Sequence, residues 1–121
     1  MELKKLNING KEVEFANAYR NTRNGFAHDT TMFVDGRRIQ EASCHYINRT
    51  WECYAYQTVM LRAVGIEIAE IKSRIKDRFM SEKGYKKLND SRKKELESAY
   101  AQNEDVVFYE AVMSKLEDRY L

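Results

Sequence analysis

The hydrophobic period of this 121-residue chain changes near Thr50, and the change divides the chain into two kinds of structure. Before Thr50, apolar residues alternate with polar ones, as in strands with one covered face. After it, apolar residues recur every three or four positions, as on one side of a helix. The length suits one domain. We therefore expect an α+β fold in a single domain 1–121, with an antiparallel sheet in 1–47 and a helical part in 48–121.

The first strands are predicted to form a hairpin around Asn9-Gly10. Alternating apolar residues flank this dipeptide, and a type I′ turn requires positive φ at both of its positions, which Asn and Gly tolerate. A two-residue turn pairs Leu6 with Val13 and Ile8 with Lys11. The polar stretch that follows, 17–24, is expected to be a connection.

A second hairpin is predicted around Asp35-Gly36, joining a strand at 26–34 to a strand at 37–46. Together the two hairpins make a four-stranded antiparallel meander with one covered face. A regular register predicts three cross-strand pairs: Met32 with Ile39, His28 with Ser43, and Phe26 with His45.

A long amphipathic helix is predicted from about Thr50 to Met80, and Gly65 in its middle permits a kink. It is longer than a four-stranded sheet can cover. Its N-terminal half should pack on the sheet, and its C-terminal half needs other partners, either the later helices or a second copy of the chain in a homodimer. Its apolar stripe consists of Tyr54, Leu61, Val64, Ile68, Ile71, Ile75 and Phe79.

Two shorter helices complete the helical part. Gly84 ends the first helix region, a second helix runs over about 90–102, and Asn103 caps a third. The three helices are expected to close into a small antiparallel bundle. The chain contains no proline, where a typical frequency of about 5% would give several, and this absence suits long helices.

Charge is strongly segregated although the net charge is only +2. Residues 72–94 carry ten basic and three acidic groups, whereas residues 95–121 carry two basic and seven acidic groups. The basic stretch is either a solvated helix end that faces the acidic third helix, a contact for nucleic-acid phosphates, or a contact for an acidic protein patch. The candidate partner-binding residues are Tyr56, Arg62, Lys72, Arg74, Lys76, Arg78, Lys86, Lys87, Glu104, Asp105 and Glu110.

Four residues are of types that bind zinc: His28, Cys44, His45 and Cys53. Their spacing fits no standard zinc finger, and the simpler interpretation is two buried cysteines and two ordinary polar histidines. We expect no cofactor, with zinc as the alternative. The chain contains no Gly-x-Ser-x-Gly, no phosphate-binding glycine loop and no His-Glu-x-x-His, so we expect no enzymatic activity.

The N-terminal residues form no apolar signal-peptide core, and no apolar run approaches the length of a membrane span. With two cysteines only, the sequence predicts a reduced, cytoplasmic protein without a membrane partner.

Two segments resemble a known group of proteins. They are RNGFAHDTTMFVDG at residues 23–36 and CHYINRTWECYAYQTVM at residues 44–60, and the run Asn48-Arg49-Thr50-Trp51-Glu52 is the most specific part. They are similar to small proteins carried by phages and other mobile elements of Gram-positive bacteria, some of which resemble anti-CRISPR inhibitors of the type II-A effector nuclease. The resemblance covers roughly residues 1–65.

The resemblance implies a stoichiometric protein ligand, in the cytoplasm of a bacterial host, that binds a type II CRISPR effector nuclease and blocks its DNA loading or cleavage. The acidic third helix would then occupy a groove that normally holds nucleic acid, or the basic segment would meet an acidic surface of the nuclease. The alternative function is a nucleic-acid-binding accessory protein of a mobile element that uses the basic segment 72–94.

Overall fold

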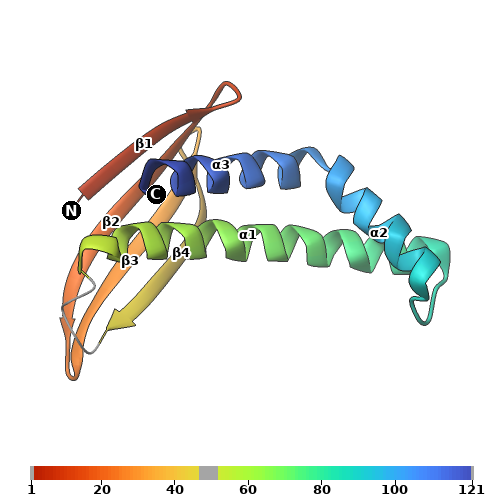
Figure 1. The fold of residues 1–121 in the computed structure, drawn as a ribbon, viewed down its shortest axis with the longest axis horizontal. Coiled ribbons are helices and arrows are strands. Elements are labelled where there is room, and N and C mark those ends of the chain that lie inside the picture. The colour runs from red at the N-terminus through yellow and green to blue at the C-terminus, as the bar shows by residue number, and fades with distance from the viewer. Residues whose placement is uncertain (1, 47–51, 121) are drawn as a thin grey trace.

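A four-stranded antiparallel sheet followed by three helices makes up the fold, so the predicted α+β class is confirmed (Figure 1). The computed structural model describes residues 2–46 and 52–120, with side chains for residues 3–46 and 56–118. The elements are β1 (Glu2–Ile8), β2 (Lys11–Thr22), β3 (Gly25–Val34), β4 (Arg37–Tyr46), α1 (Glu52–Lys83), α2 (Asp90–Gln102) and α3 (Glu104–Tyr120).

Both predicted two-residue turns are present. Asn9 and Gly10 have φ values of 51° and 82°, and Asp35 and Gly36 have values of 49° and 81°, as a type I′ turn requires. The first turn pairs Leu6 with Val13 and Ile8 with Lys11, as predicted. The preference of Asn-Gly and Asp-Gly for positive φ therefore predicts the positions of both hairpin turns.

The predicted connection over 17–24 is wrong, because β2 continues through it to Thr22. The backbone of this stretch pairs with β3 as far as Thr22 opposite Gly25, which leaves a short turn between the two strands. Asn17 is fully buried in β2, and its Nδ2 donates a hydrogen bond to Met60 Sδ of α1 at 3.6 Å. The polar composition of residues 17–22 therefore did not indicate a strand, although β3 and α1 hold these residues in β2.

The predicted register of the second hairpin is wrong beyond its first pairs. Phe33 pairs with Arg38, but Met32 pairs with Gln40, so Ile39 is an extra residue in β4. Because a β-bulge shifts the register by one residue, every later side chain of β4 changes its partner. His28 therefore lies opposite Cys44 instead of Ser43, and Phe26 lies opposite Tyr46 instead of His45.

One face of the sheet is covered by α1 and α3, which run side by side in opposite directions (Figure 1). The N-terminal half of α1 packs on the sheet as predicted, with four buried side chains at Val59, Met60, Ala63 and Val64. Strands and helices share a large apolar core, whose fully buried side chains include Phe15, Met32, Met60 and Leu116. A smaller buried cluster joins β4 to α1 and consists of Ala42, Cys44, Val59 and Ala63.

Beyond the sheet, the C-terminal half of α1 and the helix α2 project as one end of the molecule (Figure 1). The predicted apolar stripe continues into this part, where Ile68, Ile71 and Ile75 are buried against a core that includes Leu96 of α2. This part of the stripe is thus covered within one chain. The helix is continuous through Gly65, and no described helix is long and apolar enough to cross a membrane.

Side-chain and backbone caps set the ends of the helices. Gly84, with φ of 67°, ends α1, and Tyr85 N donates to Met80 O at 3.2 Å. Asn89 Oδ1 accepts from Arg92 N at 2.9 Å and begins α2. Asn103 begins α3 by accepting from two backbone N–H groups, as its position in the sequence predicts.

Candidate functional site

The residues considered as zinc ligands lie on different surfaces. His28 and Cys44 face each other on the helix-covered side of the sheet, whereas His45 lies on the open side and is exposed. The predicted pairing of His28 with Ser43 would place the two histidines on one face and Cys44 on the other, and it is wrong because of the bulge in β4. The side chain of Cys53 lies outside the described residues. Among the side chains that the structure describes, no group of three or more His, Cys, Asp or Glu could hold a metal ion.

The His28 imidazole is only 3% exposed and is surrounded by aromatic rings. Its ring centroid lies 4.6 Å from that of Tyr56 and 5.4 Å from that of Tyr19, both nearly edge to face. Phe26 and Tyr46 contact it at 5.6 and 5.9 Å. Tyr56, proposed from the sequence as a partner-binding residue, packs against the core of its own chain. Its contact with a partner stays a prediction.

This aromatic cluster joins the two segments that carry the family resemblance. The first segment supplies Phe26 and His28, and the second supplies Tyr46 and Tyr56. The resemblance therefore coincides with packing between the sheet and the start of α1.

A polar network crosses the open face of the sheet, and sequence analysis did not identify it. Asp29 of β3 accepts from Arg20 Nε of β2 at 2.8 Å and from Ser43 Oγ of β4 at 2.5 Å. Arg20 Nη2 lies 3.1 Å from His45 Nε2, and because a guanidinium group only donates, the imidazole nitrogen accepts. No sequence motif marks these four residues, since the bulge decides which of them share a face.

The ionisation of Asp29 reflects this network. Burial alone would raise the pKa of its carboxyl, but the hydrogen bonds from Ser43 and Arg20, together with the positive charge of Arg20, outweigh it. The net result is a lowered pKa, so the carboxylate is held in its charged form.

Arg62, another candidate partner residue, is exposed on α1 and donates from Nη1 to the Ser43 backbone oxygen at 2.7 Å. β4 is an edge strand of the sheet. The guanidinium group therefore satisfies one carbonyl of an edge that would otherwise be open to another strand.

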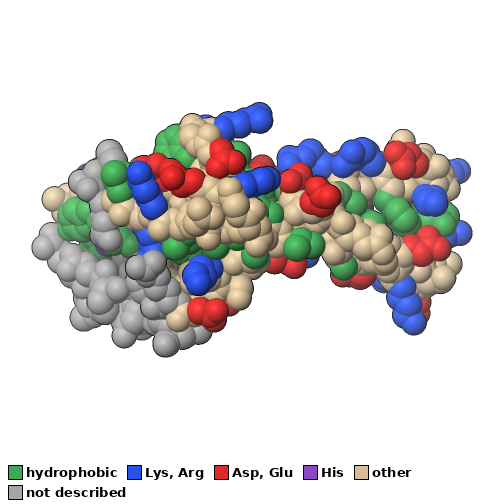
Figure 2. All heavy atoms as spheres, turned by 90° about the horizontal axis from the view of Figure 1, so that it is seen from above, with side chains coloured by type: hydrophobic (Ala, Val, Ile, Leu, Met, Phe, Trp, Pro, Cys, Tyr) green, Lys and Arg blue, Asp and Glu red, His purple; other side chains and the backbone are tan. Residues whose placement is uncertain are grey.

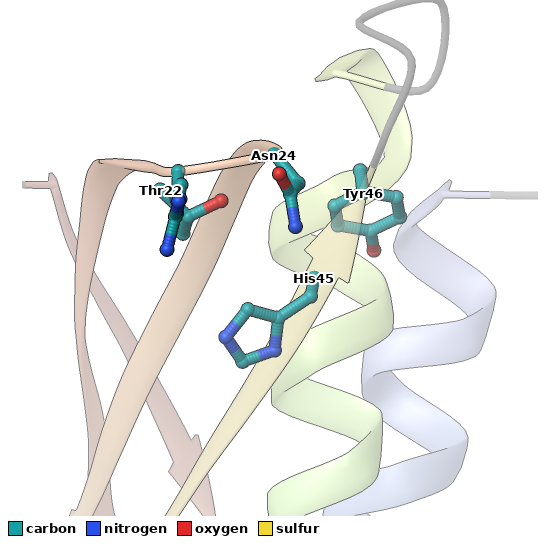
Figure 3. Close-up of a pocket in the computed structure, with 5 residues that line it drawn as sticks. Thr22, Asn24, His45 and Tyr46 are labelled. Carbon is teal, nitrogen blue, oxygen red and sulfur yellow. The ribbon is translucent and has the colours of Figure 1, made fainter.

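A pocket of about 450 Å³ lies where the turn between β2 and β3 faces the end of β4 (Figure 3). Three of its lining residues are an arginine, a histidine and an asparagine, none is Asp or Glu, and the hydroxyl of the lining residue Tyr46 is buried. The lining residues are Thr22, Arg23, Asn24, His45 and Tyr46.

The basic residues predicted from the sequence divide into two groups. Lys72 Nζ lies 3.9 Å from a Glu110 carboxylate oxygen and 5.3 Å from the centre of the Tyr100 ring, so it joins α1 to α3 and α2. Arg74 lies near Glu67. The other basic side chains lie farther along the projecting end, where Figure 2 shows Lys and Arg on the surface of the right-hand part of the molecule.

We call this second group the basic tip. It consists of Lys76, Arg78, Lys83, Lys86, Lys87, Arg92, Lys93 and Lys94. None of these eight has a carboxylate within ion-pair distance among the described residues. Among the described residues, the predicted cancellation between the basic stretch and the acidic third helix is therefore limited to Lys72, which pairs with Glu110.

The exposed side of α3 is acidic. Glu104, Asp105, Glu110, Glu117 and Asp118 are all exposed, and Glu110 is the one that pairs with a base among the described residues. Glu110 and Glu117 are separated by two helical turns and so lie on the same side. An apolar side chain, Val107, is 47% exposed beside them.

Two buried titratable groups, Glu67 of α1 and Tyr109 of α3, have raised pKa values. Burial raises the pKa of Glu67, with further contributions from Glu70 and Asp105 that Arg74 partly opposes. Burial also raises the pKa of Tyr109 to about 12, together with the neighbouring carboxylates of Glu67 and Asp105. Negative charge is thus concentrated where α1 meets α3.

Comparison of the chain with protein-family models, with curated proteins and with solved structures finds no match to any of them.

Proposed function

We propose that this protein is a stoichiometric inhibitor that binds a type II CRISPR effector nuclease and blocks its DNA loading or cleavage. The proposal is supported by the resemblance of residues 23–36 and 44–60 to small mobile-element proteins. The structural observation that supports it best is the exposed acidic side of α3, where Glu110 is the one carboxylate that pairs with a basic residue among the described side chains.

Effector nucleases of this class hold their nucleic acids in a positively charged channel. The carboxylates of α3 have the charge that such a channel attracts, and electrostatic complementarity favours rapid and specific association. The exposed Val107, in the first turns of α3, adds an apolar contact beside these carboxylates. In this function the acidic side of α3 competes with nucleic acid for the channel.

Co-purification of the full chain with a type II-A effector nuclease tests the proposal, with the nuclease alone, with guide RNA, and with guide RNA and target DNA. We expect a stable complex in at least one state and inhibition of DNA cleavage at equimolar protein. Absence of a complex in all three states would overturn the proposed function.

Charge reversal tests the contribution of α3. The double variant Glu117→Lys/Asp118→Lys should weaken binding at least tenfold. The control Glu12→Lys/Glu97→Lys changes the net charge equally at exposed positions of β2 and α2, and it should bind nearly as well as the unmodified chain. Equal losses in both variants would show that α3 is not the contact surface.

A further inference from the structure

We propose that the basic tip binds the phosphate backbone of double-stranded nucleic acid without sequence preference. This inference goes beyond nuclease binding and does not depend on it. The basic segment 72–94 predicts contact with nucleic acid as an alternative function. The inference places this contact on the basic tip. Three observations support it. The basic side chains of the tip have no carboxylate partner among the described residues, the loop between α1 and α2 is held in place by side-chain contacts, and the two aromatic rings of the tip are partly buried.

Residues 76–94 carry eight basic and three acidic side chains, a net charge of +5. Six lysines and Arg78 are exposed in this range. Since no carboxylate of the described chain pairs with them, a phosphate backbone would not have to displace an internal ion pair. The tip projects beyond the sheet, where a long charged polymer can approach it (Figure 1).

The loop between α1 and α2 is held by contacts on both of its sides. The Tyr85 ring lies 5.6 Å from the Phe79 ring, and the Arg92 guanidinium stacks over Tyr85 at 4.0 Å. Arg92 Nη1 also donates to the Lys87 backbone oxygen at 2.9 Å. Lys86 and Lys87 are therefore presented from an ordered loop, which lowers the entropic cost of their contacts with phosphates.

The chemistry of the tip favours duplex over single-stranded nucleic acid. Single-strand binding surfaces stack bases on accessible aromatic rings. The aromatic side chains within residues 76–94 are Phe79 and Tyr85. Both are partly buried, their rings contact each other, and Arg92 stacks over Tyr85. The tip thus offers seven exposed cationic side chains but no fully exposed aromatic ring, and a duplex has the higher density of phosphates.

The salt dependence follows from the number of phosphates contacted. If four lysines each neutralise one phosphate, log K should fall with log salt concentration with a slope of about −3.6. Between about 50 and 200 mM salt this slope corresponds to a loss of affinity of roughly 100-fold.

Fluorescence anisotropy with a labelled duplex of mixed sequence, measured over this salt range with the full chain, tests the proposal. The double variants Lys86→Glu/Lys87→Glu and Lys93→Glu/Lys94→Glu should each weaken binding at least tenfold and flatten the slope. A matched control, Lys5→Glu/Lys115→Glu, makes the same change in net charge on β1 and α3 and should weaken binding less than about threefold. Circular dichroism establishes that each variant is folded.

Three results would overturn the proposal. The first is unchanged duplex binding by both tip variants, and the second is an equal loss in the control, which would mean that net charge alone attracts the duplex. The third is tighter binding of oligo(dT) or of polyglutamate than of the duplex, which would assign the tip to a single strand or to an acidic protein. Since the assay contains no nuclease, its failure leaves the inhibitor proposal intact.

Discussion

The Asp29 carboxylate of β3 accepts a 2.5 Å hydrogen bond from the Ser43 hydroxyl of β4 across the open face of the sheet. Its second oxygen accepts from Arg20 of β2, so three neighbouring strands are joined through one side chain. This junction stabilises the charged form of Asp29, as its lowered pKa indicates.

The variant Asp29→Asn should be less stable than the unmodified chain at neutral pH, by about 1 kcal/mol or less because the ion pair is partly exposed. A lowered pKa contributes stability above the ordinary value of 3.8, and this contribution is lost as the pH falls through the pKa of the folded state. Urea unfolding of both proteins at neutral and at strongly acidic pH should show a difference that disappears in acid. A difference that is constant with pH would contradict this prediction.

Glu67 should give the opposite pH dependence. Its pKa is raised in the folded state, so its ionisation costs stability as the pH rises from about its ordinary value of 4.5 through the folded-state pKa. Glu67→Gln retains the shape of the side chain without the charge and should raise the melting temperature at neutral pH but not below the ordinary pKa. Glu117→Gln, at an exposed position of α3, is the control and should change the melting temperature little at either pH.

The backbone conformation of α1 at position 65 does not require glycine. A Cβ at this position would lie 3.7 Å from Met113 Cε, an ordinary van der Waals distance. Gly65→Ala should therefore stabilise the protein by about 0.5–1 kcal/mol, the gain in helix propensity. Gly84→Ala, at φ of 67°, should instead destabilise it by about 1–2 kcal/mol. Chemical denaturation measures both, and a loss of stability in Gly65→Ala would show that α3 requires the closer approach.

Asn103 should contribute to stability through the cap of α3. Its Oδ1 accepts from Asp105 N at 3.0 Å and from Val106 N at 3.1 Å. Asn103→Ala should cost about 1 kcal/mol in the free energy of unfolding. Asn103→Asp retains an accepting oxygen at the helix N-terminus and should recover most of the loss, whereas equal destabilisation by both variants would assign the effect to something other than the cap.

Several parts of the fold could be predicted because their causes are local. The turns at Asn9-Gly10 and Asp35-Gly36 require positive φ at adjacent residues, and few dipeptides other than these tolerate it. The period of the apolar residues predicted all three helices, and Asn103 marked the start of the last one. The segregation of charge likewise identified the residues of the basic tip and of the acidic side of α3.

The sequence by itself determined the order and type of the elements, since turn geometry, helix periodicity and helix caps act over a few neighbouring residues. Only the tertiary structure decided the register beyond Ile39, because a bulge arises from the pairing of two strands with the helix above them. That single extra residue places Cys44 opposite His28 and His45 beside Arg20. Tertiary packing also decided which charges are neutralised, since it brings Lys72 to Glu110. The lysines of the tip stay exposed, and no carboxylate among the described side chains pairs with them.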